Sequence, residues 1–367
     1  MVTALGRSWP GAAELDVRLR DDGPEGGTLV QALAYPDLVG QAEIGDTVLL
    51  NTSALALGLG TGGYALVVAL PDRLPPDVHG PGHLVKARYL PLQATVLGVD
   101  EPDSPHHEAL RDADGLAGMP VVVADLHSSL PAVLAGLLHD RPATTVAYVE
   151  TDGGALPLAF SRTVSGLRDA GWLAGTVTVG QAFGGDLEAV TVHNGLLAAQ
   201  RVLRADVAVV TQGPGNLGTG TRWGFSGVAV GEVVNAVGVL GGRPIAALRL
   251  SQADTRDRHV GVSHHSLTGY GRVALVSADV PVPELAGEFG VLVRRQVEEL
   301  AGRHRLVTVD CAGLLDALAA CPVPLSTMGR GLAQDAPAFL AAAAAGRHAA
   351  TLLGRGRPEP GPGGSVA

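Results

Sequence analysis

Residues 119–151, MPVVVADLHSSLPAVLAGLLHDRPATTVAYVET, contain the pattern that decides the fold. A β-branched run, VVVAD, is followed by a polar loop, a helix expected to begin near Leu130, and a second β-rich run, TTVAYVET. Ser129 is suited to cap that helix at its N-terminus. Uninterrupted apolar strands that alternate with amphipathic helices are typical of a parallel sheet covered on both faces. This unit therefore predicts an α/β fold.

The same alternation continues toward the C-terminus. Val230, Val233, Val234 and Val237 have the i, i+3, i+4, i+7 spacing of a helix with one buried face. Further β-rich runs occur in the strings GTVTVG, ADVAVVTQ, PIAALRLS, GRVALVSADV and HRLVTVD. We therefore predict a doubly wound, mainly parallel, Rossmann-like α/β domain over residues 100–353.

The first 99 residues have a different pattern, in which short β-rich runs are separated by turns. These runs are ELDVRLR, GTLVQALAY, GDTVLLNTSALAL, GYALVVAL and YLPLQATVLGV. Short strands at close spacing, without a clear helix, are typical of a small barrel or a curled sheet. Residues 1–99 are therefore predicted to form a small β-barrel-like domain. The last segment, residues 354–367, offers nothing to bury and is expected to be a disordered tail.

The composition is that of a globular protein and disfavours several kinds of partner. Of the 367 residues, 46% are hydrophobic and 17% are charged, and the net charge is −10. A negative net charge disfavours nucleic-acid binding, because the phosphates of nucleic acids are neutralised by Lys and Arg. The sequence has no apolar run of about 18 residues and no charged leader before an apolar run. We therefore expect a cytoplasmic protein without a membrane segment, and we also expect self-association.

Several unusual strings occur in one order along the chain: SPHHEALR at 104–111, AFGGDLEAV at 182–190, GPGNLGTGT at 213–221 and GVSHHSLTG at 261–269. Together they resemble an uncharacterised bacterial family that is catalogued as a domain of unknown function. The resemblance extends over nearly the whole chain up to about Gly271. It implies no activity, cofactor or catalytic residue, so the chemistry has to be read from the residues themselves.

A glycine-rich stretch follows the strand predicted in ADVAVVTQ. It matches the G-x-G-x-x-G pattern of dinucleotide-binding loops. The pattern continues into more loop, and a threonine stands where a P-loop needs lysine, so a Rossmann NAD site and a P-loop NTPase are both disfavoured. Backbone N–H groups in such a loop can still bind an anion, although an irregular crossover loop explains the glycines equally well. The predicted anion-binding residues are Gly213, Gly215, Gly218, Thr219, Gly220, Thr221, Arg222 and Ser226.

Polar residues follow several predicted strands, at the end of the sheet where open α/β folds bind ligands. Asp125 and His127 follow VVVA, and Asp152 follows AYVET. Two of the carboxylates have structural alternatives, since Asp186 could cap a helix and Asp152 could form an Asx turn. Adjacent side chains diverge, so only one histidine of the pair His264–His265 is expected to face a site. We predict as catalytic residues, and as candidate ligands of a divalent metal, His127, Asp152, Asp186 and His264.

No motif identifies the reaction. The chain has no H-E-x-x-H zinc signature, so metal binding is inferred from residue types, and no G-x-S-x-G elbow, which disfavours a serine triad. The favoured hypothesis is a hydrolase-type enzyme that acts on a small anionic or phosphorylated metabolite. Acid–base or metal-assisted chemistry would take place at the carboxyl ends of the strands. The alternative is a non-catalytic protein that binds a metabolite or regulates a partner.

Overall fold

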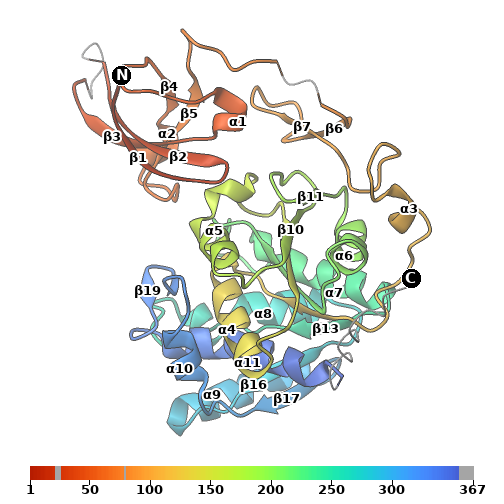
Figure 1. Cartoon of the computed structure of the whole chain (residues 1–367). Helices are drawn as coiled ribbons and strands as arrows, with labels where there is room; N and C mark the ends of the chain where they lie inside the picture. Colours follow the sequence, from red (N-terminus) through yellow and green to blue (C-terminus); the bar gives the residue numbers. More distant parts are fainter. Residues whose placement is uncertain (21–25, 78–79, 355–367) are drawn as a thin grey trace, which may run out of the picture.

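A computed structural model describes residues 1–20, 26–77 and 80–354 of the chain (Figure 1). It contains an eight-stranded sheet, a separate five-stranded sheet and three two-stranded pairs. The predicted tail, apart from Gly354, lies outside the described residues. Within the described part of the chain, no helix combines the length and the apolar character that a membrane crossing requires.

The eight-stranded sheet is parallel throughout, and its strand order is β11-β10-β9-β12-β8-β13-β16-β17. Its central strands are almost completely buried, as expected for a parallel sheet with helices on both faces. The predicted α/β class is confirmed. The strands are β8 (Pro120–Val123), β9 (Val146–Thr151), β10 (Gly175–Thr178), β11 (Leu187–Glu188), β12 (Val207–Gln212), β13 (Arg243–Ala246), β16 (Asp279–Pro283) and β17 (Arg305–Val309).

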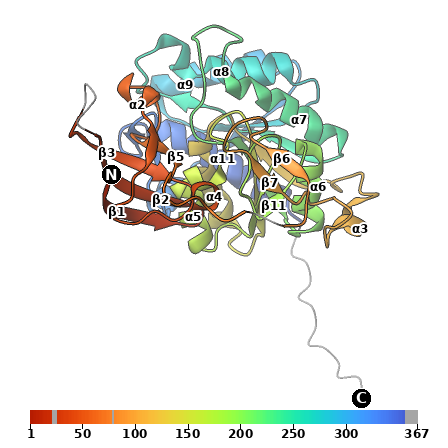
Figure 2. The same ribbon diagram turned by 90° about the horizontal axis from the view of Figure 1, so that it is seen from above.

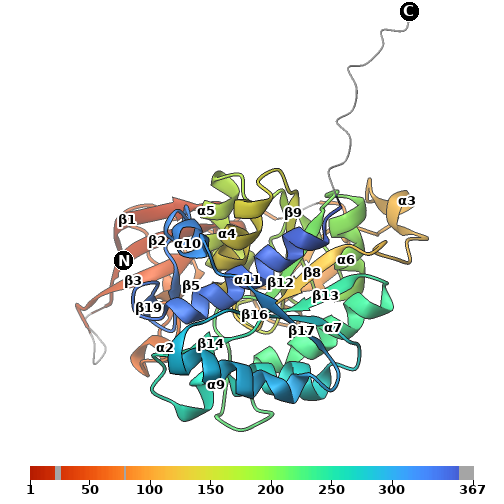
Figure 3. The same cartoon turned by 90° about the horizontal axis from the view of Figure 1, so that it is seen from below.

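Two layers of helices cover the sheet (Figures 2 and 3). Val122 of β8 faces the first layer, whereas its neighbours Val121 and Val123 face the second, because successive side chains of a strand point to opposite faces. The first layer contains α4 (Leu130–Asp140), α5 (Arg162–Asp169), α10 (Leu314–Ala319) and α11 (Ala336–Leu352). The second contains α6 (Val192–Arg201), α7 (Val230–Val239) and α9 (Gly287–Val297).

Glycines allow α4 and α11 to pack closely in the first layer. A Cβ atom on Gly136 of α4 would lie 2.0 Å from the carbonyl oxygen of Ala343 in α11. A Cβ atom on Gly346 of α11 would lie 1.9 Å from the carbonyl oxygen of Val133 in α4. Any side chain at either position would therefore force the two helices apart.

A small pocket, lined by Asp125, Gln212 and Ser226 among others, forms a crevice at the carboxyl end of β8. β8 lies between β12 and β13. The chain leaves β8 toward α4 in the first layer and leaves β12 toward α7 in the second layer. Connections that diverge from neighbouring strands leave room at their carboxyl ends, and doubly wound sheets bind ligands there. Because β12 is inserted between β8 and β9, the order differs from that of dinucleotide-binding Rossmann folds.

The N-terminal sheet is mixed, with the order β1-β2-β3-β5-β4, and only β3 and β5 are parallel. Backbone hydrogen bonds join Val2 to Gly45 and Asp46, so the segment that leads into β4 curls back to β1. A β unit ahead of the α/β unit was predicted, and it is present. Its strands are β1 (Val2–Trp9), β2 (Ala12–Arg18), β3 (Leu29–Ala34), β4 (Leu49–Asn51) and β5 (Ala65–Ala69), with the short helices α1 (Pro36–Val39) and α2 (Ser53–Ala56).

The last run predicted for this β unit belongs elsewhere. Within it only β7 (Ala94–Val96) is a strand, and it pairs with β6 (Leu84–Lys86) in a separate hairpin. This hairpin contacts the edge of the parallel sheet, because Lys86 Nζ lies 2.8 Å from Glu188 Oε2 of β11. Lys86 is also the donor to the carbonyl oxygens of Thr178 and Ala182, so a buried ion pair attaches this edge hairpin. The short helix α3 (His107–Leu110) then leads to β8.

Candidate functional site

Three histidines gather between the end of β13 and the start of β16. His259 ends a 3-10 turn, η4 (Asp257–His259), and His264 and His265 begin α8 (His264–Thr268). One ring nitrogen from each lies within 4.8 Å of the others. Among the described residues, this is the only group of three or more His, Cys, Asp or Glu side chains with that spacing. We call these three residues the histidine cluster.

A short hairpin brings the three rings together. β14 (Leu250–Ser251) pairs with β15 (Gly261–Val262), so the loop that carries His259 returns to the start of α8. Gly261 has a φ of +72°, and a Cβ atom there would lie 2.1 Å from Gln296 Oε1, so this turn requires glycine. Ser263 then caps α8 by accepting a hydrogen bond from His265 N.

The hydrogen bonds of the rings leave one nitrogen of each available. Nδ1 of His265 lies 3.0 Å from Asp125 Oδ2, and Nδ1 of His259 lies 2.7 Å from Ser263 Oγ. An ionised carboxylate only accepts hydrogen bonds, so the bond to Asp125 requires the proton on His265 Nδ1 and leaves Nε2 with its lone pair. Arg249 Nη1, which lies 3.0 Å from the same Nδ1, is then a close contact without a hydrogen bond. Within the described part of the chain, Nε2 of His264 is buried and has no hydrogen-bond partner. Buried polar atoms nearly always have a partner, so a buried imidazole nitrogen without one indicates that a ligand binds there.

Asp125 follows β8 directly and is 3% exposed. Burial alone raises the pKa of this carboxyl group, but the hydrogen bond from His265 and the charge of Arg249 outweigh burial and lower the pKa. Arg249 Nη1 lies 3.4 Å from Asp125 Oδ2. Asp125 is therefore an ionised carboxylate that orients His265, the arrangement that commonly accompanies metal-ligating histidines.

The imidazoles of His259 and His264 are neutral. Burial, followed by the charges of Arg249 and Arg256, lowers the pKa of His259 to about 3. Burial, followed by the neighbouring His265 and Arg258, lowers the pKa of His264 to about 4. A neutral imidazole is the form that binds metal. At pH 7 these two rings therefore need no deprotonation before they could bind a cation.

The glycine-rich loop forms one wall of the histidine cluster. Gly218 and Phe225 form a backbone bridge that closes this loop. The ring of Phe225 stacks on His265, with the centroids 3.8 Å apart and the planes 7° apart. The hydroxyl of Ser226 donates to Asn216 Oδ1 and accepts from Leu217 N, so it braces the loop and makes no helix cap. Thr219, Gly220, Thr221 and Arg222 are exposed at the loop tip beside the cluster. Anion binding by this loop remains a prediction.

Of the four predicted catalytic residues, only His264 lies in the histidine cluster. Asp186 accepts from the backbone and hydroxyl of Thr176 and pairs with Arg168 at 2.6 Å, so it ties a loop to β10, the strand next to the edge of the sheet. Asp152 accepts from Gln181 N at 2.9 Å. Within the described part of the chain, no group of side chains close enough to share a metal ion contains either of these two carboxylates together with His264.

The pair His264–His265 departs from our expectation that only one ring would face a site. Both rings enter the cluster, and their centroids lie 4.5 Å apart. Both rings belong to the cluster because the loop that carries His259 packs its ring against each of them, with centroid distances of 5.0 Å to His264 and to His265. Sequence reasoning missed His259, His265 and Arg249. The spacing H-x4-H-H from His259 to His265 was the one available signal.

His127 belongs to a second polar network on the other side of β8. Its Nδ1 lies 3.0 Å from the hydroxyl of Tyr148, and its Nε2 lies 2.7 Å from Ser161 Oγ. The Tyr148 hydroxyl also lies 3.1 Å from Glu150 Oε2 and 2.8 Å from Thr211 Oγ1. Burial lowers the pKa of His127 to about 4 and raises that of Glu150 to about 8. Two neutral groups thus share a buried hydrogen-bond chain.

The N-terminal sheet packs beside this second network. Trp9 Nε1 donates to the carbonyl oxygen of Ala159 at 2.6 Å, and Arg162 Nη1 lies 3.3 Å from Glu14 Oε1. Glu14 is also hydrogen-bonded by the hydroxyl of Tyr64. The N-terminal unit therefore holds the loop between β9 and α5, which carries Ser161.

Comparison with known proteins assigns the chain to a family but gives no activity. A search of curated proteins finds no match. The model of one family, described as "Protein of unknown function (DUF3866)", matches residues 31–346. The matched region includes the parallel sheet, the glycine-rich loop and the histidine cluster. The chain belongs to the DUF3866 family, which is described as one of unknown function.

Proposed function

We propose that this protein is a metal-dependent, hydrolase-type enzyme that acts on a small anionic metabolite. In this proposal His259, His264 and His265 hold a divalent cation such as Zn²⁺. The observation that carries the proposal is the buried Nε2 of His264, which has no hydrogen-bond partner among the described residues and lies beside two rings whose Nδ1 atoms are already hydrogen-bonded. Three imidazoles are one of the ligand sets of catalytic zinc sites, in which water or substrate takes the fourth position.

The surrounding residues fit this chemistry. A cation bound by three neutral ligands keeps its full charge, which acidifies a bound water or polarises a substrate oxygen. Asp125 fixes the orientation and protonation of His265. The cluster lies at the crevice beside β8, since Asp125 follows β8 and Arg249 follows β13. That is the place where ligands of doubly wound sheets bind.

Two arginines support an anionic substrate. The side chain of Arg249 is 9% exposed, and its Nη1 donates to Asp125 Oδ2. Its Nε and Nη2 make no hydrogen bond within the described residues. These two N–H groups are a planar pair of donors that matches the oxygens of a carboxylate or phosphate group. Arg258 is exposed next to His259, and its Nη2 lies 3.7 Å from the place where a Cβ atom on Gly220 would be. The glycine-rich loop could thus share an anion with Arg258.

The alternative is a non-catalytic protein that binds a metabolite or regulates a partner. The close stacking of Phe225 on His265 favours this alternative. The aromatic ring covers one face of a proposed metal ligand and so leaves a substrate less room to reach the metal. A metal in such a setting would stabilise the fold instead of performing chemistry. For either function we propose a cytoplasmic, self-associating protein without a nucleic-acid partner, on the basis of composition and the net charge of −10.

Metal titration of the purified protein tests the proposal. After EDTA treatment and buffer exchange, wild type should bind one equivalent of Zn²⁺, whereas H264A should not. H193A is the matched control, because His193 is an exposed histidine on α6 outside the cluster. Absence of stoichiometric binding by wild type would refute the proposal.

A panel of chromogenic phosphate and carboxylate esters then separates the two functions. Turnover that requires Zn²⁺ and is lost in H264A supports the enzyme. Zn²⁺ binding without turnover of any ester, together with a large rise in melting temperature, favours the non-catalytic alternative.

A further inference from the structure

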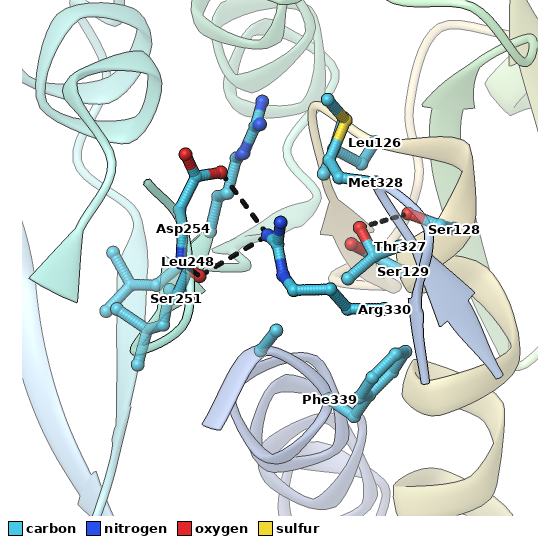
Figure 4. A pocket seen from close by; sticks show the side chains of 13 residues that line it. Leu126, Ser128, Ser129, Leu248, Ser251, Asp254, Thr327, Met328, Arg330 and Phe339 are labelled. Atoms are coloured by element: carbon cyan, nitrogen blue, oxygen red, sulfur yellow. Dashed lines mark hydrogen bonds and ion pairs between the residues drawn. The ribbon is translucent and has the colours of Figure 1, made fainter. Parts of the chain in front are cut away.

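A hairpin near the C-terminus places an arginine behind the loop that carries His259. The hairpin consists of β18 (Ser326–Thr327) and β19 (Arg330–Gly331). Between its strands, Met328 and Gly329 have φ angles of +49° and +78°. Arg330 extends into a small pocket, with Asp254 and Ser251 on one side and Thr327 on the other (Figure 4).

Arg330 joins two buried carboxylates. Its Nη2 lies 3.3 Å from Asp254 Oδ2, and its Nε lies 3.1 Å from Asp335 Oδ2. The side chains of Asp254 and Asp335 are 2% and 0% exposed, respectively. Carboxylates so deeply buried require a cation and hydrogen-bond donors close by, since an unpaired buried charge is strongly destabilising. Arg330 is the cation that both carboxylates share.

The two carboxylates in turn hold the loop that leads to His259. Asp335 accepts from Ser251 Oγ at 2.6 Å and from Gln252 N at 2.9 Å. Asp254 accepts from the backbone N–H of Arg256 at 3.0 Å and from its guanidinium group at 2.9 and 2.8 Å. The start and the middle of the 251–259 loop are thereby fastened to the C-terminal part of the chain.

The three histidines differ in how they are held. His264 and His265 belong to a helix that Ser263 caps. His259 lies at the end of the 251–259 loop, and its own ring makes one hydrogen bond, to Ser263. Without the Arg330 network, the loop would keep its base, where β14 pairs with β15, but would lose its fixed path to His259. The position of His259 therefore depends on residues that do not touch it.

We infer that Arg330 is a positioning residue of the histidine cluster, which sets metal affinity by fixing the loop that presents His259. This inference rests on the proposed metal site. Within the described residues Arg330 forms no hydrogen bond or ion pair with any of the three histidines, so it acts through Asp254, Asp335 and the loop backbone. Supporting contacts beyond the ligands of a metal site commonly change its affinity by 10- to 100-fold.

Co²⁺ binding to the full-length protein, followed by its visible absorption spectrum, tests the inference. R330M should bind Co²⁺ about tenfold more weakly than wild type, with altered absorption bands. R330K, which keeps the charge, should recover part of the affinity. R347M is the matched control, because Arg347 pairs with Asp140 and is 13% exposed, and it should bind Co²⁺ like wild type.

A milder variant covers the case in which R330M does not fold. S251A removes only the hydroxyl that donates to Asp335 and accepts from the backbone N–H of Asp254. It should weaken Co²⁺ binding in the same direction. Wild-type affinity and spectrum in R330M, or in S251A where R330M does not fold, would overturn the inference. Failure of the wild type to bind Co²⁺ would instead overturn the metal site, and the inference with it.

Discussion

Replacing Glu150 by glutamine should remove a pH-dependent loss of stability. Glu150 is 0% exposed, and within the described residues its Oε1 atom has no hydrogen-bond partner. Burial raises the pKa of this carboxyl group from 4.5 to about 8, and the hydrogen bond from Tyr148 offsets only part of that rise. Near pH 7 the folded protein therefore keeps Glu150 protonated, whereas the unfolded chain does not.

The sign and size of the effect follow from proton linkage. Between pH 4.5 and about 8 the folded state binds the Glu150 proton and the unfolded state releases it, so stability falls as pH rises through this window. At about 1.4 kcal/mol per pH unit, the total loss reaches at most about 5 kcal/mol. The glutamine of E150Q is neutral at every pH, so this part of the pH dependence of the unfolding free energy is absent in the variant. Its amide leaves a buried N–H without a partner, which costs about 1–3 kcal/mol independently of pH.

Urea unfolding at a series of pH values from 4.5 to 9, followed by tryptophan fluorescence, measures the effect. The difference in unfolding free energy between E150Q and wild type should shift in favour of E150Q as pH rises, and should level off above pH 8. E298Q is the control, because Glu298 is exposed, and its difference from wild type should not change with pH in this way. A constant difference for E150Q across the window would refute a protonated Glu150.

Two further substitutions test the site and the core. D125N removes the carboxylate that accepts from His265 Nδ1 and should weaken Zn²⁺ binding by about 10- to 100-fold in isothermal titration calorimetry; unchanged affinity would mean that Asp125 does not orient His265. G136A places a Cβ atom 2.0 Å from the carbonyl oxygen of Ala343 and should lower the unfolding free energy by about 1–3 kcal/mol or more in urea titration. G302A, where a Cβ atom meets nothing within 4 Å, should leave that free energy within about 0.5 kcal/mol of wild type; equal losses in both variants would contradict the packing argument.

The parallel sheet could be predicted because its strands carry their own signal. β8 and the part of β9 before Glu150 are continuous apolar runs, and helical spacing marks α7 between later strands. β1 was missed, since most of its side chains are partly or fully exposed and its strand form depends on pairing with β2. The run GRVALVSADV was predicted as one strand, but β16 begins only at Asp279.

Tertiary contacts explain that difference. Gly269–Val273 forms a π-helix in place of a strand, and the buried Tyr270 hydroxyl donates to the carbonyl oxygen of Val123 at 2.7 Å. Local β propensity is overridden when a residue reaches a buried partner far away in the sequence. The long-range hydrogen bond of Tyr270 that accompanies the helical form of this segment therefore cannot be read from the local sequence pattern.

The site was only partly predictable for a similar reason. Asp125 was recognised at a strand end and His264 as a candidate ligand, because each lies in a segment with a clear pattern. His259 lies in a polar turn whose return path depends on β14 pairing with β15 and on the Arg330 network. Asp152 and Asp186 follow strands as well, but they accept hydrogen bonds from nearby backbone N–H groups, a role that residue type alone does not distinguish from catalysis.

The central claim is that three histidine nitrogens form one metal site, and X-ray absorption at the zinc K-edge tests it most directly. Protein loaded with one equivalent of Zn²⁺ should give a first coordination shell with three imidazole nitrogens at about 2.0–2.1 Å. The multiple-scattering signal of imidazole should fall in H259A, H264A and H265A, and should persist in H193A. A first shell of oxygen or sulfur ligands, or a spectrum that is unchanged in the three cluster variants, would contradict the account.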